Sequence, residues 1–574
     1  MLTFDNLSFS YRKQPADALN HITMALDPGF YLLLGENGAG KTTMLKIIAG
    51  LLTPREGSCL LDGVPSDSDT PACKGRAFML EDNSYFPGKT IRDFARAHSP
   101  FYPGFSQELF DSNLEAFGLT GNEQFKNASL GNRKKAQLAY VLALGVDFLL
   151  LDEPTNALDL QAKRTLQQLL AREITPEQTA IISTHTITEL EFLYDGLIML
   201  SHGQLVFAAT EDEISERLAF VSSPEPLPEA LFSEQNLGRH LAILPADAAG
   251  DFDSDRTDWR RLYFALNSPA RERILSLFSK DAPEARLCAE NDAATKDVAT
   301  KAAATQAAEN PSCPASSRFS LARVLKLARW NNLKVRTQLI WTPVISLAVA
   351  ICLLLPLPNW AQMTLFTLLS TIISYLGQLS PLDFGRGGDA RPVLKMLPVS
   401  ASEKLVYYLF YAVILIPALL FILPTIASYL YLHIPAIQTP GMLHVYEVKF
   451  NSSLATLTAI GAASYLFSTL LCTYVVMRSR INRIINGVIA VVVAAAVNGV
   501  LGLIWGLTLA FNQGFRDAVE GRPKASETEI MEITQQYFNT PNLVSYMTLA
   551  VTLTAVIVLT VLIYRLFSPK HYHN

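Results

Sequence analysis

The chain has 574 residues, carries 47 Lys and Arg against 52 Asp and Glu, and is half hydrophobic. This length favours two or more domains, and the nearly neutral balance of charge gives no support for a nucleic-acid partner. The six cysteines show no CxxC spacing, which argues against a zinc site and a disulfide framework. The opening MLTFDNLSFSY has no basic stretch followed by an apolar core, so we expect no cleavable signal peptide.

The first motif in chain order is a phosphate-binding loop. Phe30–Leu34 predicts a strand, GENGAGKT from Gly35 to Thr42 satisfies G-x-x-x-x-G-K-[ST], and an amphipathic helix follows. Glycines allow backbone N–H groups to surround phosphates, and the helix directs its positive end at them. We therefore expect Lys41 to reach the β and γ phosphates of a nucleotide and the Thr42 hydroxyl to bind Mg²⁺.

A second predicted strand, DFLLLDEP at 147–154, ends in two carboxylates. Asp152 is placed to hold Mg²⁺ through water. Glu153 faces a different direction and is placed to polarise the attacking water. A charged strand end often has no functional role. Its pairing with a phosphate loop favours a catalytic role here. The earlier stretch SLGNRKKAQ (129–137) is either a basic helix start or half of a nucleotide site.

The middle of the chain carries no recognisable chemistry. Residues 211–280 contain TDWRRLYFALNSPARERILSLF, which predicts a helical appendage with Trp259, Leu262, Tyr263 and Leu266 at core spacing. Residues 281–317 are rich in Ala, Thr and charge and predict a flexible linker. The next stretch, RFSLARVLKLARWNNLKVRTQ, predicts either an amphipathic helix at the inner membrane surface or an ordinary solvated helix.

The last part of the chain, residues 318–574, predicts a membrane domain. Six apolar segments lie at about 339–358, 361–380, 405–432, 454–476, 484–511 and 543–566, and most have the length of a membrane-crossing helix. Alternate loops carry the positive charge, such as Arg478, Arg480 and Arg483. We therefore expect a multi-pass protein of the cytoplasmic membrane with both termini in the cytoplasm. The segments contain almost no ionisable residues, which disfavours ion-coupled transport.

Residues 1–210 resemble the ATP-binding cassette (ABC) family in the order and spacing of these motifs. The resemblance implies an α/β P-loop NTPase, here fused to an all-α six-helix polytopic membrane domain. It implies that Tyr11 stacks on adenine, that the D-loop NALD supplies Asp159, and that His185 in AIISTH contacts the γ-phosphate. SLGNRKKAQ is similar to the family signature LSGGQ at Ser129 and Gly131, while Ala128, Leu130 and Asn132 depart from it.

Two further roles follow from the resemblance. The signature acts on ATP held by an opposite subunit, which implies a dimer, either of identical chains or of two different ones. Glu81 occupies the position of the family's Q-loop glutamine, which helps to hold Mg²⁺ and senses the membrane domain. The implied nucleotide-binding set is Tyr11, Gly35, Asn37, Gly38, Gly40, Lys41, Thr42, Thr43, Glu81, Ser129, Gly131 and Asp159. Thr42, Asp152 and Glu81 are implied for the metal, and Glu153 and His185 for catalysis.

The whole chain resembles an ABC half-transporter with an ABC-2-type exporter layout. The resemblance implies ATP-driven export of an amphipathic or apolar substrate such as a peptide, drug or lipid. The loop at 380–404 either contacts the cassette near Glu81 or is a plain connector. A rival hypothesis is an ATP-binding sensor or regulatory membrane subunit that transports nothing, because the signature and Glu81 are irregular. A soluble cassette acting on ribosomes or DNA conflicts with the apolar second half.

Overall fold

The computed structural model describes residues 1–11, 17–82, 84, 86, 89–125, 127–185, 187–236, 239–248, 256–279, 319–330, 396–411, 550 and 553–563. The chain divides into two units. The first comprises Met1–Lys326, Phe384–Ser400 and Pro569–Asn574, and the second comprises Leu327–Asp383 and Ala401–Ser568. The predicted linker (281–317) and four of the predicted spans lie outside the described residues, as do most of the third span and part of the sixth.

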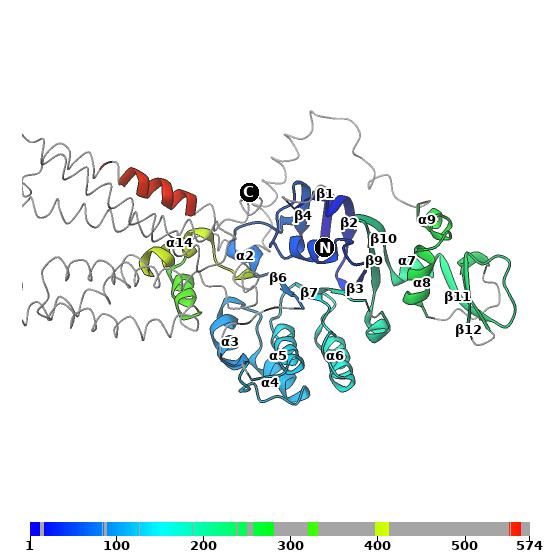
Figure 1. The fold of residues 1–574 in the computed structure, drawn as a ribbon, viewed down its shortest axis with the longest axis horizontal. Coiled ribbons are helices and arrows are strands. Elements are labelled where there is room, and N and C mark those ends of the chain that lie inside the picture. The colour runs from blue at the N-terminus through cyan, green and yellow to red at the C-terminus, as the bar shows by residue number, and fades with distance from the viewer. Residues whose placement is uncertain are drawn as a thin grey trace, which may run out of the picture. The chain divides into compact units, whose positions relative to one another are not determined.

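A six-stranded sheet in the order β10-β9-β3-β8-β7-β6 forms the centre of the first unit (Figure 1). Its strands are β3 (Gly29–Leu34), β6 (Ala77–Leu80), β7 (Phe148–Asp152), β8 (Thr179–Ser183), β9 (Gly196–Ser201) and β10 (Gln204–Thr210). All neighbours pair in parallel except β9 and β10. Every residue of β7 and β8 is buried, as expected for apolar runs covered on both faces. The two strands predicted from sequence are confirmed.

The order of these strands creates the position of the functional site. The phosphate loop follows β3, the two acidic residues end and follow β7, and β8 lies between those strands. Because β3, β8 and β7 run in parallel, their carboxyl ends meet at one edge of the sheet.

A second, antiparallel sheet has the order β2-β1-β4-β5. Its strands are β1 (Leu2–Phe9), β2 (Leu19–Leu26), β4 (Glu56–Leu61) and β5 (Val64–Pro65). In β2, buried Ile22, Met24 and Leu26 alternate with exposed residues, which is the pattern of a strand with one face on the core.

Helices pack against the sheets, and most of them begin at a polar capping residue. Their bounds are α1 (Lys41–Ile48), α2 (Pro71–Lys74), α3 (Ile91–His98), α4 (Gln107–Ala116), α5 (Leu130–Leu142) and α6 (Leu160–Glu173). The side chains of Thr90, Ser106, Ser129 and Asp159 accept a hydrogen bond from the first turn of α3, α4, α5 and α6. Helices α3, α4 and α5 pack together in one group (Figure 1).

The appendage at residues 211–280 is not wholly helical, so that prediction is wrong in part. Its elements are α7 (Glu211–Ser215), β11 (Leu218–Ser223), β12 (Phe232–Asn236), β13 (Arg239–Pro245), α8 (Trp259–Leu266) and α9 (Arg271–Ser279). Strands β11, β13 and β12 form an antiparallel sheet, because apolar runs such as LAFV bury themselves by pairing. The helices predicted around Trp259 are confirmed, with Trp259, Leu262 and Leu266 buried and Tyr263 half-buried.

Most of the remaining described residues are helical. Residues 321–330 form a helix, as predicted for the amphipathic stretch. In the second unit, α14 (Ala401–Leu409) buries Glu403 and Tyr408, and residues 553–563 are helical. Among the residues described, no helix combines the length and the apolar character that crossing a membrane requires.

A column of stacked aromatic rings fills the core beneath α3. The ring of His98 lies between Phe94 and Tyr102, with ring centroids 4.7 and 5.1 Å away. Its Nδ1 is 2.7 Å from the hydroxyl of Tyr140. The side chain is completely buried, and burial lowers the pKa of His98 to about 3.

The buried histidine predicts a loss of stability in acid. The unfolded chain takes up a proton at His98 near pH 6.5, whereas the folded chain resists it down to about pH 3. The contribution of neutral His98 to the free energy of unfolding is therefore fully present above about pH 6.5. Below that pH it falls by about 1.4 kcal/mol per pH unit. We expect His98→Phe, which keeps the ring stack, to remove this slope in urea titrations of the full chain between pH 7 and 5. The exposed-site control His202→Asn should keep it, and an equal slope in wild type and His98→Phe would contradict the assignment.

Candidate functional site

The phosphate loop leaves the start of α1 open for an anion. Gly40 precedes the helix with φ 105°, and no side chain caps the first turn. A Cβ on Gly40 would lie 2.6 Å from the carbonyl oxygen of Ala18, so only glycine fits there. The free backbone N–H groups of this turn are the donors that phosphate oxygens need. Asn37 and Gly38 are exposed at the tip of the loop.

Lys41 lies folded over the loop. Its Nζ donates to the carbonyl oxygens of Gly35 at 2.7 Å and Glu36 at 3.1 Å. Burial lowers the pKa of Lys41, while the charges of Glu153 and Asp152 act in the opposite direction. A triphosphate would offer this ammonium stronger, charged acceptors than two carbonyls. The predicted phosphate-binding role of Lys41 therefore fits its position.

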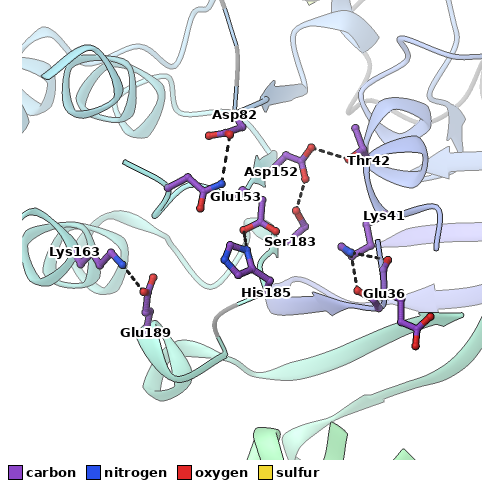
Figure 2. A network of polar contacts seen from close by, with 12 residues as sticks. Glu36, Lys41, Thr42, Asp82, Asp152, Glu153, Lys163, Ser183, His185 and Glu189 are labelled. Carbon is purple, nitrogen blue, oxygen red and sulfur yellow. Dashed lines mark hydrogen bonds and ion pairs between the residues drawn. The ribbon is translucent and has the colours of Figure 1, made fainter. Parts of the chain in front are cut away.

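Asp152 joins three elements at the carboxyl edge of the sheet (Figure 2). Its Oδ2 accepts from the Thr42 hydroxyl at 2.8 Å, and its Oδ1 accepts from the Ser183 hydroxyl. The side chain is buried, with 8% of its surface exposed. A hydroxyl beside one carboxylate fits Mg²⁺, which commonly takes one or two protein oxygens and completes its shell with phosphates and water. The structure thus brings together Thr42 and Asp152, as predicted.

Ser183 was missed by sequence reasoning. It is the last residue of β8 and lies directly opposite Asp152 in the parallel register. A hydroxyl residue two positions before an implied histidine, at the end of a neighbouring strand, was the available signal.

Glu153 and His185 form a polar pair next to Asp152 (Figure 2). The carboxylate Oε2 of Glu153 is 2.8 Å from Nδ1 of His185. Glu153 has φ 48°, a left-handed conformation that is unfavourable for a residue with a side chain, and its N–H donates to the Ser183 carbonyl at 3.0 Å. This bend separates the directions of Asp152 and Glu153. The pair is therefore placed for a base and its orienting partner, whereas the expected contact of His185 with a γ-phosphate stays a prediction.

Tyr11 and Thr43 are also brought together. The Tyr11 hydroxyl is 3.1 Å from Oγ1 of Thr43, and its ring meets Phe9 edge to face. With 38% of its surface exposed, the ring retains an accessible surface for a nucleobase. Its stacking on adenine stays a prediction.

The signature residues begin α5 and touch the segment before α6. Ser129 caps α5 by accepting from the Asn132 N–H at 3.2 Å. A Cβ on Gly131 would lie 2.8 Å from the Ala157 carbonyl, so the two segments approach closely at this glycine. Asp159 caps α6 and pairs with Lys135 at 2.8 Å, which holds the pKa of its carboxyl below the ordinary value. The roles of these residues toward a nucleotide stay predictions.

Glu81 forms an ion pair with α1 and makes no hydrogen bond or ion pair with Thr42 or Asp152 among the described residues. Its Oε2 lies 3.1 Å from Nζ of Lys46 on α1. Its Oε1 is buried and has no hydrogen-bond partner among the described residues, so one acceptor is left for a ligand. Nothing in these contacts assigns that ligand, and Mg²⁺ binding by Glu81 stays a prediction.

Asp82 connects two nucleotide-site motifs, which sequence reasoning did not foresee. Its two oxygens lie 3.3 Å from Nζ of Lys134 on α5 and 3.4 Å from Nδ2 of Asn156 after β7. Lys134 is only 3% exposed, and burial lowers its pKa against the opposing charges of Asp82, Asp152 and Glu153. A basic residue in SLGNRKKAQ is thus buried among the charges of Asp82, Asp152 and Glu153 rather than on a solvated helix face.

A short segment from the second half of the chain lies against the cassette. Met396 Sδ accepts from the N–H of Met79 on β6 at 3.2 Å, and its carbonyl accepts from the Tyr102 hydroxyl at 3.1 Å. Lys74 donates to the Val399 carbonyl at 3.2 Å. The expected contact between loop 380–404 and the cassette is confirmed for Met396 and Val399, with Met79 two residues before Glu81, and the plain-connector alternative fails there.

Comparisons with known proteins agree with this geometry. The family model described as ABC transporter matches residues 19–156. The ABC transporter ATP-binding protein NatA of Bacillus subtilis is 27% identical over 237 residues, which cover 38% of this chain and 96% of NatA. The uncharacterised ABC transporter ATP-binding protein YtlC of the same organism is 33% identical over 245 residues, or 40% and 92% of the two chains. The taurine import ATP-binding protein TauB of Mesorhizobium japonicum is 32% identical over 209 residues, or 35% and 80%.

The geometry predicts a separation of binding and turnover at Glu153. Glu153→Gln removes the proton acceptor while leaving Lys41 and the phosphate loop in place. We expect ATP hydrolysis by the full chain to fall by about 10²- to 10⁴-fold, the usual contribution of a general base, with ATP affinity retained. The exposed carboxylate control Glu115→Gln on α4 should hydrolyse ATP like the wild type. Retained turnover in Glu153→Gln would assign the base elsewhere.

Proposed function

Because this chain belongs to the ABC transporter family, whose cassettes bind Mg²⁺ and ATP and couple hydrolysis to transport, we propose that it is one subunit of a membrane exporter. Residues 1–210 supply the ATPase, and the apolar segments after residue 339 supply six membrane spans at the cytoplasmic membrane. Both termini lie in the cytoplasm. The substrate is amphipathic or apolar, of the class of a peptide, drug or lipid.

The contact of residues 396–400 with the cassette carries this proposal. These residues precede the third predicted span and lie on β6, α2 and the residues that follow α3. The contact includes buried side chains, those of Met396, Leu397 and Val399. A movement of the cassette during the ATP cycle would act directly on the apolar half of the same chain.

Export rests on the fusion of cassette and apolar half in one chain, an arrangement that favours export over import in this family. TauB, by contrast, is named for import. The decisive assay therefore has to record the direction of flux as well as its ATP dependence.

The subunit works as a dimer in this proposal. Within the described residues, Ser129 and Gly131 make no hydrogen bond to their own phosphate loop. Their contacts are with α5 and with Ala157, which leaves the Ser129–Gly131 turn available to the nucleotide of a second subunit.

Complementation between two inactive variants tests the dimer. Lys41→Ala removes the phosphate contact of one subunit, and Ser129→Arg blocks the signature of the other. Each variant alone should lose ATP turnover, whereas co-expressed chains assemble one intact site from the Lys41 of one subunit and the signature of its partner. The readout is ATP hydrolysis by mixed particles purified through two affinity tags. Absence of recovery would argue against a shared site.

The coupling contact predicts a variant that hydrolyses ATP without transport. Tyr102→Phe removes the hydrogen bond to Met396 and should cost about 1 kcal/mol at that contact. We expect ATP hydrolysis within about twofold of wild type, but fewer molecules moved per ATP. Flux is followed in proteoliposomes with a fluorescent phospholipid analogue and a hydrophobic cationic dye.

The matched control is Tyr31→Phe, which loses a similar hydroxyl bond, to the Asp27 carbonyl at 3.0 Å, elsewhere in the cassette. Its flux per ATP should equal that of the wild type. Equal ratios in Tyr102→Phe and Tyr31→Phe would remove the coupling role.

A sensor subunit is the second candidate, favoured by the departures from the family signature around Ser129 and by the Glu81–Lys46 pair. ATP hydrolysis that is lost in Glu153→Gln, with no movement of either probe in either direction, would support this candidate over the exporter.

A further inference from the structure

The segment that follows His185 is anchored rather than loose. Two short turns, η2 (Ile187–Glu189) and η3 (Glu191–Leu193), follow His185. We name His185 and residues 187–194 the switch segment. Leu190 and Tyr194 are buried within it, with 1% and 2% of their surfaces exposed. Since His185 contacts Glu153 at 2.8 Å, any shift of this segment alters the orientation of the catalytic carboxylate.

Helix α6 holds the switch segment from one side. Lys163 forms an ion pair with Glu189, and the Gln167 amide donates to the Glu189 carbonyl (Figure 2 shows Lys163 with Glu189). This contact belongs to the cassette itself.

Helix α8 of the appendage holds the switch segment at a second point. The indole Nε1 of Trp259 donates to the Glu191 carbonyl at 3.2 Å. The ring of Trp259 meets Tyr194 edge to face, with centroids 6.2 Å apart, and Tyr194 in turn contacts Phe30 of β3. Trp259 is 2% exposed. Its one polar atom is thus directed at the backbone of the switch segment and not at its own sheet.

A buried arginine fixes α8 to the sheet of the appendage. The Nη1 of Arg261 donates to the carbonyls of Val221 on β11 at 3.4 Å and Ala242 on β13 at 3.2 Å. Its Nη2 pairs with Asp258, the residue that caps α8, at 3.1 Å. Separating a buried guanidinium from its partners is costly, so α8 and the sheet of the appendage move as one body. Contacts therefore continue from β11 and β13 through α8 to Glu191 and Tyr194 of the switch segment.

We propose that the appendage controls ATP hydrolysis by holding the switch segment, and that Trp259 is the positioning residue through which it acts. The appendage then has a role beyond packing. Simple packing would need the apolar ring of Trp259 only, whereas positioning needs its N–H bond to Glu191 as well. The two roles are separable, because phenylalanine keeps an aromatic ring and lacks the donor.

The test compares Trp259→Phe with the wild type in the full chain in lipid nanodiscs. We expect kcat for ATP to fall by about 3- to 10-fold, the range for loss of one buried hydrogen bond. KM should stay unchanged, because Tyr11 and Lys41 lie on other elements. The matched control Phe264→Leu alters an exposed ring on the same helix and should change neither constant.

A double-mutant cycle with His185→Gln distinguishes positioning from general weakening. If Trp259 acts through His185, Trp259→Phe should lower the residual kcat of His185→Gln by less than about twofold. An unchanged kcat in Trp259→Phe, or the same fold-loss in both backgrounds, would overturn the proposal.

If Trp259→Phe does not fold, Asp258→Ala gives an equivalent test. It removes the cap of α8 and the partner of Arg261 while keeping the indole, and it should lower kcat at constant KM. Wild-type kcat in that variant would overturn the proposal. These assays follow ATP alone, so their outcome is independent of whether the chain exports a substrate.

Discussion

The site depends on one buried carboxylate that ties three elements together. Asp152 ends β7, accepts from Thr42 at the start of α1 and accepts from Ser183 at the end of β8. A buried acid without such donors would be costly, and here two hydroxyls satisfy it. The same two bonds set the distance between the phosphate loop and the acidic strand. The position of Glu153 is fixed by the same elements, because its N–H donates a hydrogen bond to the Ser183 carbonyl.

Charge around this centre is close to balanced before any nucleotide arrives. Asp152, Glu153 and Asp82 face two partly or fully buried lysines, Lys41 and Lys134. A triphosphate would bring several further negative charges into this space, which explains in electrostatic terms why the site needs Mg²⁺. The basic residues of SLGNRKKAQ lie in different environments. Lys134 is buried beside the acids, whereas Lys135 pairs with Asp159 near the surface.

The strands and motifs of the cassette were predictable because they are local. GENGAGKT needs a strand, a turn and a helix in immediate succession, and the apolar run before Asp152 needs burial on both faces. Contacts between distant segments were not predictable in the same way. Ser183, Asp82 and Trp259 act through partners 31, 52 and 68 residues away, respectively. The sheet in the appendage was missed because the helical pattern around Trp259 dominated the reading of a region whose strands are short. The predicted membrane spans stay predictions.

The contact between Met79 and Met396 has a consequence for biosynthesis. Strand β6 is the last in its sheet, and the residue that covers its backbone is 317 positions later in the chain. At bacterial or eukaryotic rates of translation, this separation corresponds to a delay of roughly 15–60 s between synthesis of the strand and of its cover. During that time the edge of the newly made cassette is open to pairing with another strand. During its synthesis the chain therefore passes through an interval in which the edge of β6 is exposed to other strands.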